Sequence, residues 1–142
     1  MKPCLVDVNV LLALVAQRHV HHQAARKWFS ALASGEAGLC RMVQLALIRL
    51  LSNPSVMGED ALPAMAAWKL VEELLQDERL EFVHEPALVD SVLPTLFVHR
   101  MPAGKLVMDA YLAAFAVAGS LRLATFDKAF EQFRGLELEL LR

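Results

Sequence analysis

The stretch CLVDVNVLL, residues 4–12, sets one acid and one amide in an otherwise apolar run. A short apolar run broken by a single acid is typical of a buried strand, here predicted over 4–8 and ending near Asp7, with a short helix over 9–16 after it. A carboxylate in so apolar a segment is unusual, because Asp side chains are rarely buried without a partner. Asp7 is therefore a candidate functional residue, although it could also serve only as the cap of the following helix.

The rest of the chain alternates between predicted strands and predicted helices. Further strands are predicted over 37–40, 80–83, 121–125 and 137–141, and further helices over 22–33, 43–51, 59–76, 107–118 and 128–133, with another beginning at Pro86. Strands that alternate with helices predict an α/β fold of three layers, a parallel sheet with helices on both faces. A chain of 142 residues fits one such domain, over 1–142.

The composition excludes several classes of protein. Hydrophobic residues make up 56% and charged residues 21%, which excludes a disordered tail or a charged-repeat protein. The longest uncharged run in the predicted helices, 110–121, is shorter than the ~20 residues that span a bilayer, so we expect no membrane protein. Cys4 and Cys40 form no metal or redox spacing and are expected to be buried, reduced thiols of a cytoplasmic protein. The net charge of −2 means that any contact with nucleic acid must be local.

Three aspartates are expected to meet at one edge of the sheet. Ligands bind at the carboxyl edge of a parallel sheet, where Asp7 follows the first strand. A helix over 109–118 carries the chain ~15 Å away from that edge, and the strand over 121–125 returns it by ~13–16 Å. Asp109 and Asp127 should therefore lie at the same level as Asp7. Carboxylates held close together repel each other, and Mg²⁺ or Mn²⁺ would relieve this repulsion and could serve phosphodiester hydrolysis.

Each of these residues also has a purely structural explanation. Asp109 could be an acid at the start of a helix, and Asp127 could cap the helix over 128–133. Asn9 could be a helix cap, and Thr125 could either donate to a carboxylate or simply suit a strand end.

Several segments, in order and spacing, resemble the motifs of one family over nearly the whole chain. Residues 7–12 resemble the D-x-N-x-L-L motif of PIN-domain ribonucleases, specifically of VapC-type toxins from VapBC toxin–antitoxin systems. Residues 19–28 are similar to the H-x-x-H-x-x-A-x-x-W stretch of one VapC branch, and residues 48–54 to the R-L-x-[ST]-N-P helix end. Asp109-Ala110 and Thr125-Phe126-Asp127 resemble the last two acidic motifs.

This resemblance implies a fold, an activity and partners. It implies a five-stranded parallel sheet of order 3-2-1-4-5, and a homodimer. It implies a metal-dependent endoribonuclease, using Mg²⁺ or Mn²⁺, that cleaves RNA in a tRNA or ribosomal RNA loop and is neutralised by a cognate VapB-like antitoxin. Asp7, Asp109 and Asp127 are carried over as the metal-site acids.

One residue departs from the family pattern. Gln44 stands about where the family has a Glu, on the helix after the second strand, and no other acid lies within 41–51. A neutral amide at this position predicts weaker metal binding, because ligand charge tunes affinity. Gln44 can still act in the catalytic site by orienting a water. The alternative to an enzyme is a PIN-like module that binds RNA or a partner through a fold with an attenuated metal site. A flap-nuclease-like or phosphatase-like hydrolase and a response-regulator-like domain fit the sequence less well.

Basic, histidine and apolar segments complete the predictions. Arg49 and Lys105 could contact RNA phosphates, together with Arg41, although Arg49 could equally pair with a structural carboxylate. The histidines at 19, 21 and 22 could suggest zinc, but their spacing favours a role in the loop and helix cap. The apolar helical segments 61–75 and 88–98 exceed what one small sheet buries, which predicts an exposed groove for a helix of the antitoxin.

Overall fold

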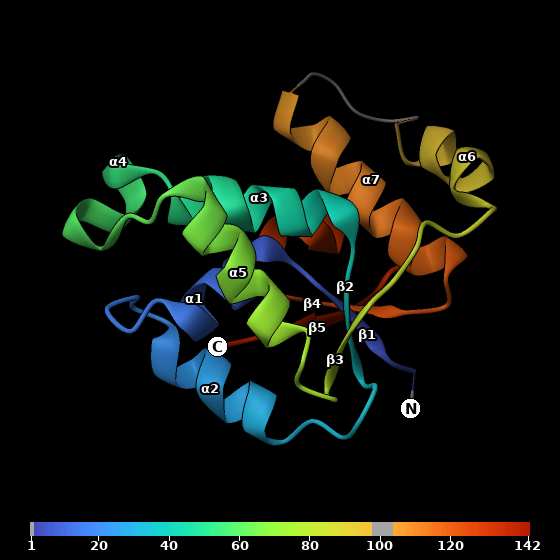
Figure 1. Cartoon of the computed structure of the whole chain (residues 1–142). Coiled ribbons are helices and arrows are strands. Elements are labelled where there is room, and N and C mark those ends of the chain that lie inside the picture. The colour runs from blue at the N-terminus through green and yellow to red at the C-terminus, as the bar shows by residue number, and fades with distance from the viewer. Residues whose placement is uncertain (1, 98–103) are drawn as a thin grey trace.

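A computed structural model of the chain describes residues 2–97 and 104–142 (Figure 1). Its centre is a parallel sheet of five strands in the order β3-β2-β1-β4-β5. The sheet confirms the predicted fold class and strand order. The strands are β1 (Cys4–Val6), β2 (Ala37–Leu39), β3 (Leu80–Phe82), β4 (Arg122–Thr125) and β5 (Glu137–Leu140).

Helices connect the strands, as parallel pairing requires. α1 packs against α2 and α3, α3 packs against α5, and α6 packs against α7. The α-helices are α1 (Val8–Val15), α2 (His22–Ser30), α3 (Arg41–Leu51), α4 (Pro54–Met57), α5 (Ala64–Leu74), α6 (Val89–Val92) and α7 (Gly104–Ala118). The described residues also form the 3₁₀ segments η1 (Gly58–Asp60), η2 (Leu93–Phe97) and η3 (Lys128–Gln132).

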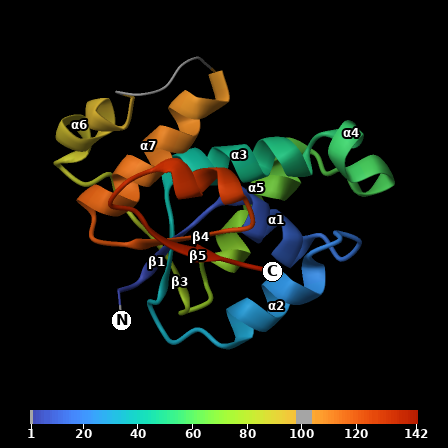
Figure 2. The ribbon, with the colours of Figure 1, turned by 180° about the vertical axis from the view of Figure 1, so that it is seen from behind.

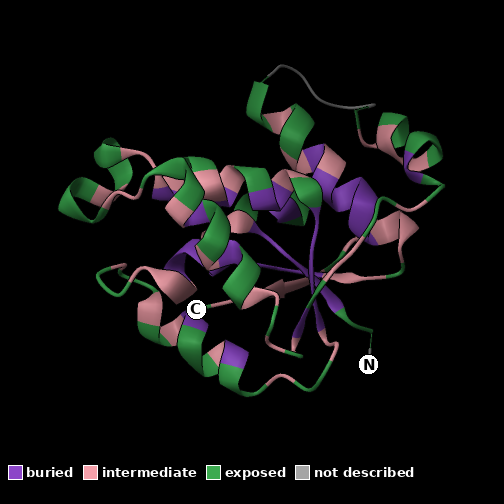
Figure 3. Cartoon of the chain, viewed as in Figure 1, coloured by how far each residue is buried: buried purple, intermediate pink, exposed green. Residues whose placement is uncertain are grey.

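The central strands are covered on both faces. Cys4, Leu5 and Val6 of β1 are all 0% exposed, although successive side chains of a strand point to opposite faces. Figures 1 and 2, seen from opposite sides, show helices around the strands in both views. In Figure 3 the central strands are coloured as buried and the outer helix faces as exposed. The burial of β1 therefore confirms the three-layer arrangement.

Prolines change two of the predicted helices. The helix predicted over 59–76 is interrupted, because Pro63 has an extended backbone and α5 begins only at Ala64. The helix predicted from Pro86 begins at Val89 and gives way at Leu93 to a 3₁₀ segment that contains Pro94. The last residue of the predicted apolar segment 88–98 lies outside the described residues. The short helix α4 was not predicted, and η1 overlaps the first residues of the helix predicted over 59–76.

No helix in the described part of the chain combines the length and the apolar character needed to cross a membrane.

Candidate functional site

Asp7 lies at the carboxyl edge of the central strand, directly after β1. Its backbone N–H donates to the carbonyl of Ala124, which ties it to β4. The side chain is only 8% exposed and caps α1, since Oδ1 accepts a 2.7 Å hydrogen bond from the N–H of Val8. Burial raises the pKa of Asp7, and the negative charges of Asp109 and Asp127 raise it further. The cap explanation is thus correct for Oδ1, whereas Oδ2 has a different partner.

Thr125 supplies the partner of that second oxygen. Its buried hydroxyl donates a 2.7 Å hydrogen bond to Oδ2 of Asp7. The same Oγ1 accepts from the backbone N–H of Asp127 at 3.0 Å and from Nδ2 of Asn9 at 3.3 Å. Oδ1 of Asn9 in turn accepts from the N–H of Phe126. Asn9 is therefore not a helix cap. It joins α1 to the segment after β4, and the Thr125 hydroxyl holds three residues of the edge in one network.

Asp109 and Asp127 are brought together around a lysine. Nζ of Lys105 lies 3.0 Å from Oδ2 of Asp109 and 2.8 Å from Oδ2 of Asp127. Oδ1 of Asp127 accepts from the N–H of Ala129 and caps η3. The hydrogen bond from Lys105 lowers the pKa of Asp127 and raises that of Lys105 itself.

The position of Asp109 corrects one expectation. Asp109 does not open its helix, because the chain is already helical at Gly104. Asp109 therefore lies one turn after Lys105, and the two form an i, i+4 pair. Its side chain is 17% exposed, so it still faces a partly buried surface.

The three aspartates are neighbours without forming a metal cage. Among the residues that the structure describes, no three His, Cys, Asp or Glu side chains are grouped as the ligands of one metal ion. Asp109 and Asp127 share Lys105, whereas Asp7 is held by Thr125. The three acids are nevertheless linked, because the Thr125 hydroxyl bonds both the carboxylate of Asp7 and the N–H of Asp127.

Gln44 lies in the first turns of α3, which begins directly after β2. Its side chain is 3% exposed, and its Oε1 accepts a hydrogen bond from Nη1 of Arg41. The guanidinium of Arg41 lies 4.7 Å from the ring centroid of Phe82, which favours a fixed orientation. Arg49 is exposed in the last turn of α3, about 12 Å along the helix from Arg41. Within the described residues it forms no ion pair with any of the three aspartates.

The fold and these residues match a known family. The family model described as PIN domain matches residues 4–136. The chain belongs to the PIN domain family.

Relatives of this PIN domain share either its sequence or its fold. It is 41% identical to Ribonuclease VapC41 of Mycobacterium tuberculosis (strain ATCC 25618 / H37Rv), with 96% of this chain and 97% of that protein covered. The crystal structure of DNA-bound VapBC from Salmonella typhimurium matches with a TM-score of 0.70 at 18% identity, over 98% of each chain. VapC20 of Mycobacterium tuberculosis, described as a sarcin–ricin loop cleaving toxin, matches with a TM-score of 0.64 at 18% identity, over 94% of this chain and 98% of that one.

The histidines of the PIN domain stabilise the segment between α1 and α2. Nδ1 of His19 accepts from the N–H of His21, and Nδ1 of His22 lies 2.7 Å from the carbonyl oxygen of Ala13. The exposed ring of His21 stacks on Phe126, with centroids 4.4 Å apart. The role in the loop is therefore confirmed, whereas His21, at the N-cap of α2, makes no side-chain cap hydrogen bond. The stack on Phe126 was not predicted, because no local pattern relates residues so far apart in sequence.

The cysteines of the PIN domain are packing residues. Cys4 and Cys40 are both free and buried, and burial raises the pKa of Cys4 to about 12. A thiol with such a pKa stays protonated and is a poor nucleophile at neutral pH. The prediction of buried thiols is confirmed.

Proposed function

We propose that this chain is a metal-dependent endoribonuclease toxin of the VapC type, which cleaves phosphodiester bonds in a tRNA or ribosomal RNA loop. One observation carries the proposal: the three predicted metal-site acids lie at one edge of the sheet. Asp109 and Asp127 both contact the ammonium of Lys105, and the Thr125 hydroxyl bonds both the carboxylate of Asp7 and the N–H of Asp127. The 41% identity to a protein named as a ribonuclease, over 96% of this chain, supports the same activity.

The donor set at this edge suits Mg²⁺ or Mn²⁺. Carboxylate oxygens are the ligands that these cations take, usually one or two together with substrate phosphate. The two Oδ2 atoms of Asp109 and Asp127 already face one positive charge, the ammonium of Lys105. Asp109 and Asp127 would therefore hold the cation, with Asp7 as the third acid of the site, although in the metal-free protein its Oδ2 is bound by Thr125. A bound divalent cation supplies activation of water and neutralisation of charge on the phosphodiester.

The remaining side chains have positioning roles. Thr125 fixes the carboxylate of Asp7, and Asn9 holds the backbone of Phe126 next to Asp127. Preorganised groups of this kind act without reorganising during the reaction. The cationic groups of Lys105 and Arg41 flank the acids and are suited to RNA phosphates, which position a substrate without reading its sequence. Arg49 could extend the phosphate contact further along α3.

Cleavage of a total-RNA pool tests the proposed activity. Purified protein, freed of any partner, is incubated with Mg²⁺, Mn²⁺ or EDTA beside two variants, Asp7→Asn and Asp90→Asn. Asp90 is an exposed acid on α6 and serves as the matched control. We expect discrete products with wild type and Asp90→Asn in either metal, and none with EDTA or Asp7→Asn. Cleavage that persists in EDTA, or in Asp7→Asn, would contradict the proposal.

A second candidate function is an RNA- or partner-binding module with an attenuated metal site. The amide of Gln44 in place of an acid, already bound by Arg41, favours this alternative. RNA binding without cleavage by wild type, with cleavage restored in Gln44→Glu, would select it. The binding module would also be selected if neither wild type nor Gln44→Glu cleaves RNA while both still bind it.

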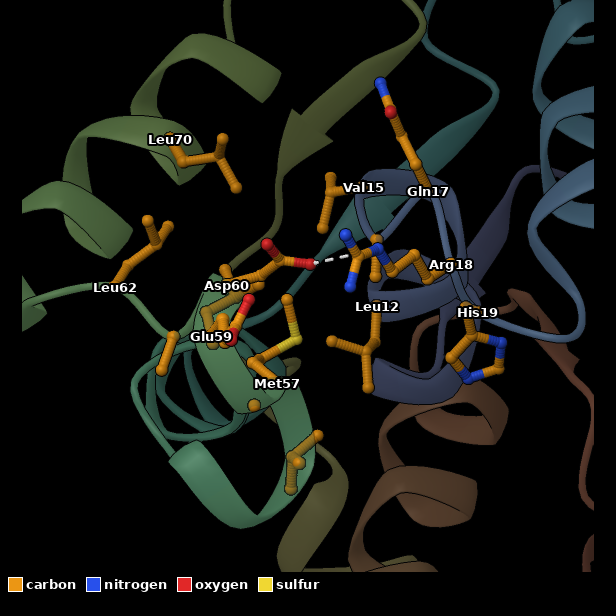
Figure 4. A pocket seen from close by; sticks show the side chains of 15 residues that line it. Leu12, Val15, Gln17, Arg18, His19, Met57, Glu59, Asp60, Leu62 and Leu70 are labelled. Carbon is orange, nitrogen blue, oxygen red and sulfur yellow. Dashed lines mark ion pairs between the residues drawn. The ribbon is translucent and has the colours of Figure 1, made fainter.

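We also propose a VapB-like antitoxin as partner, bound in the groove of Figure 4. The groove has a volume of about 810 Å³ and lies between the carboxyl end of α1, the segment from α4 to Leu62, and Leu70 of α5. Leu12, Val15, Leu62 and Leu70 give it an apolar lining, which suits the apolar face of a partner helix. Arg18 and Asp60 pair across it at 3.7 Å, drawn as the dashed line in Figure 4.

This groove agrees with only half of the predicted docking surface. Residues of the predicted segment 61–75 line it, whereas none of the described residues of 88–98 do, since α6 and η2 pack against α7. Exposed apolar side chains remain on α3 and α5, where Leu45 is 54%, Met65 64% and Trp68 37% exposed. We propose that these exposed side chains of α3 and α5 contribute to the interface of a homodimer. Light scattering on the purified chain would detect the dimer. We further propose that the protein acts in the cytoplasm, where its RNA substrate lies.

A further inference from the structure

Lys105 occupies an unusual position between two acids of the site. Its ammonium lies 2.8 Å from Asp127 and 3.0 Å from Asp109, which belong to segments far apart in the sequence. In each acid the atom that faces Lys105 is Oδ2, while Oδ1 of Asp127 is used by the N–H of Ala129. Two carboxylates thus direct one oxygen each at a single positive charge.

The three side chains differ in their exposure to solvent. Asp109 is carried by the body of α7 and Asp127 caps η3, with side chains 17% and 31% exposed. The side chain of Lys105 is 70% exposed, and its ammonium is carried on a flexible four-carbon stem. The two acids are therefore held on the less exposed parts of the fold. The ammonium can leave them with little loss of free energy, because exposed ion pairs are weak.

We propose that Lys105 is a positioning residue that holds the place of the divalent cation in the metal-free protein and has to leave when the cation binds. The inference rests on the proposed function, because it assumes that Asp109 and Asp127 are metal ligands. Without a cation, the ammonium offsets the repulsion between these carboxylates and keeps their oxygens turned toward a common point. With a cation, the same oxygens are occupied and Lys105 is released to solvent. Lys105 therefore sets the metal affinity of the site.

Metal binding by EDTA-treated protein, measured without RNA, tests this role. Isothermal titration with Mn²⁺ is compared for wild type, Lys105→Met and the control Lys128→Met. Lys128 is exposed and adjacent to Asp127 in sequence, so its substitution removes the same charge near the site, and among the described contacts it forms no ion pair with Asp127. Since exposed ion pairs are weak, we expect Lys105→Met to bind Mn²⁺ about three- to tenfold more tightly than wild type. Lys128→Met should stay within about twofold.

Thermal unfolding gives a second readout that a purely structural ion pair would not produce. In EDTA, Lys105→Met should unfold at a lower temperature than wild type, because the two carboxylates lose their counter-charge. Saturating Mn²⁺ should remove this difference. A difference that persists in Mn²⁺ would make Lys105 an ordinary structural brace and overturn the inference.

The titration also separates this inference from the proposed function. Equal or weaker Mn²⁺ binding by Lys105→Met would overturn the role of Lys105, even if wild type cleaves RNA. Tighter binding by Lys105→Met, in a protein that cleaves no RNA, would support the role of Lys105 and count against the ribonuclease.

Discussion

The hydroxyl of Thr125 donates a 2.7 Å hydrogen bond to Oδ2 of Asp7, so that the ends of two neighbouring strands are joined at the acidic edge. Both side chains are buried, at 0% and 8% exposure. The same hydroxyl oxygen accepts from the N–H of Asp127. A single hydroxyl thus couples two of the three acids of the candidate site.

Substitution of Thr125 by Val should destabilise the protein. Val keeps the shape of the side chain but leaves Oδ2 of Asp7 without its donor, and an unsatisfied buried group costs about 1–3 kcal/mol. We expect the free energy of unfolding in urea to fall by about that amount, and RNA cleavage to fall with it. Thr125→Ser, which keeps the hydroxyl, should retain most of both. Equal stability of the Val and Ser variants would contradict this role.

Substitution of Asp7 by Asn should separate activity from stability. Burial and the two neighbouring acids raise the pKa of Asp7. The ionised carboxylate therefore lowers the free energy of unfolding at neutral pH. In EDTA at pH 7 we expect Asp7→Asn to raise the free energy of unfolding, because the neutral amide removes a charge that burial disfavours. RNA cleavage should be lost in the same variant. A clear loss of stability would show that the carboxylate is held mainly for its hydrogen bonds.

Substitution of Gln44 by Glu should strengthen the metal site. The new carboxylate would meet Arg41, which already donates to Oε1 of Gln44, so its burial would be partly compensated. We expect metal affinity and the rate of RNA cleavage to rise about tenfold, since ligand charge tunes the binding of hard cations. Gln44→Met, which lacks any donor or acceptor of this kind, is the control. A rate for Gln44→Glu no higher than that of wild type would mean that the amide suffices.

A charge placed in the apolar groove should block the antitoxin. Val56 lines the groove and is 45% exposed, so Val56→Glu leaves the core intact. Burying a carboxylate against an apolar partner helix is unfavourable, and we expect at least about tenfold weaker binding of a VapB-like antitoxin in a surface-binding assay. Leu88→Glu, at a 61% exposed position on the segment before α6, is the matched control. Equal effects of the two substitutions would place the antitoxin elsewhere.

Low pH should weaken the contact that Arg79, next to β3, makes with α2. Arg79 donates to both carboxylate oxygens of Asp77, which lowers the pKa of Asp77 to about 2, and it also donates to the carbonyl of Phe29. Because the pKa is lower in the folded than in the unfolded protein, this contribution is complete above pH 4 and is lost as the pH falls toward 2. The melting temperature of wild type should therefore fall more steeply over this range than that of Asp77→Asn. Parallel pH profiles would contradict the prediction.

The sequence by itself predicted the sheet and the acids. The alternation of short apolar runs with amphipathic helices identified all five strands, and the connectivity placed Asp7 and Asp127 at the same edge, because parallel strands end on the same side of a sheet. Burial of Cys4 and Cys40 followed in the same way from their places in apolar runs. These features depend on local periodicity and on element order, which a sequence displays directly.

Only the tertiary structure decided how the acids are partnered. Lys105 was recognised as a basic residue near Asp109, but its bridge to Asp127 spans 22 residues, and the stack of His21 on Phe126 and the bond from Asn9 to Thr125 span still more. Such contacts depend on side-chain rotamers and on which strands become neighbours, and neither leaves a local pattern. The groove likewise required the break at Pro63 and the turn of α4 beside α1, since a cavity is formed by elements together and not by any one of them.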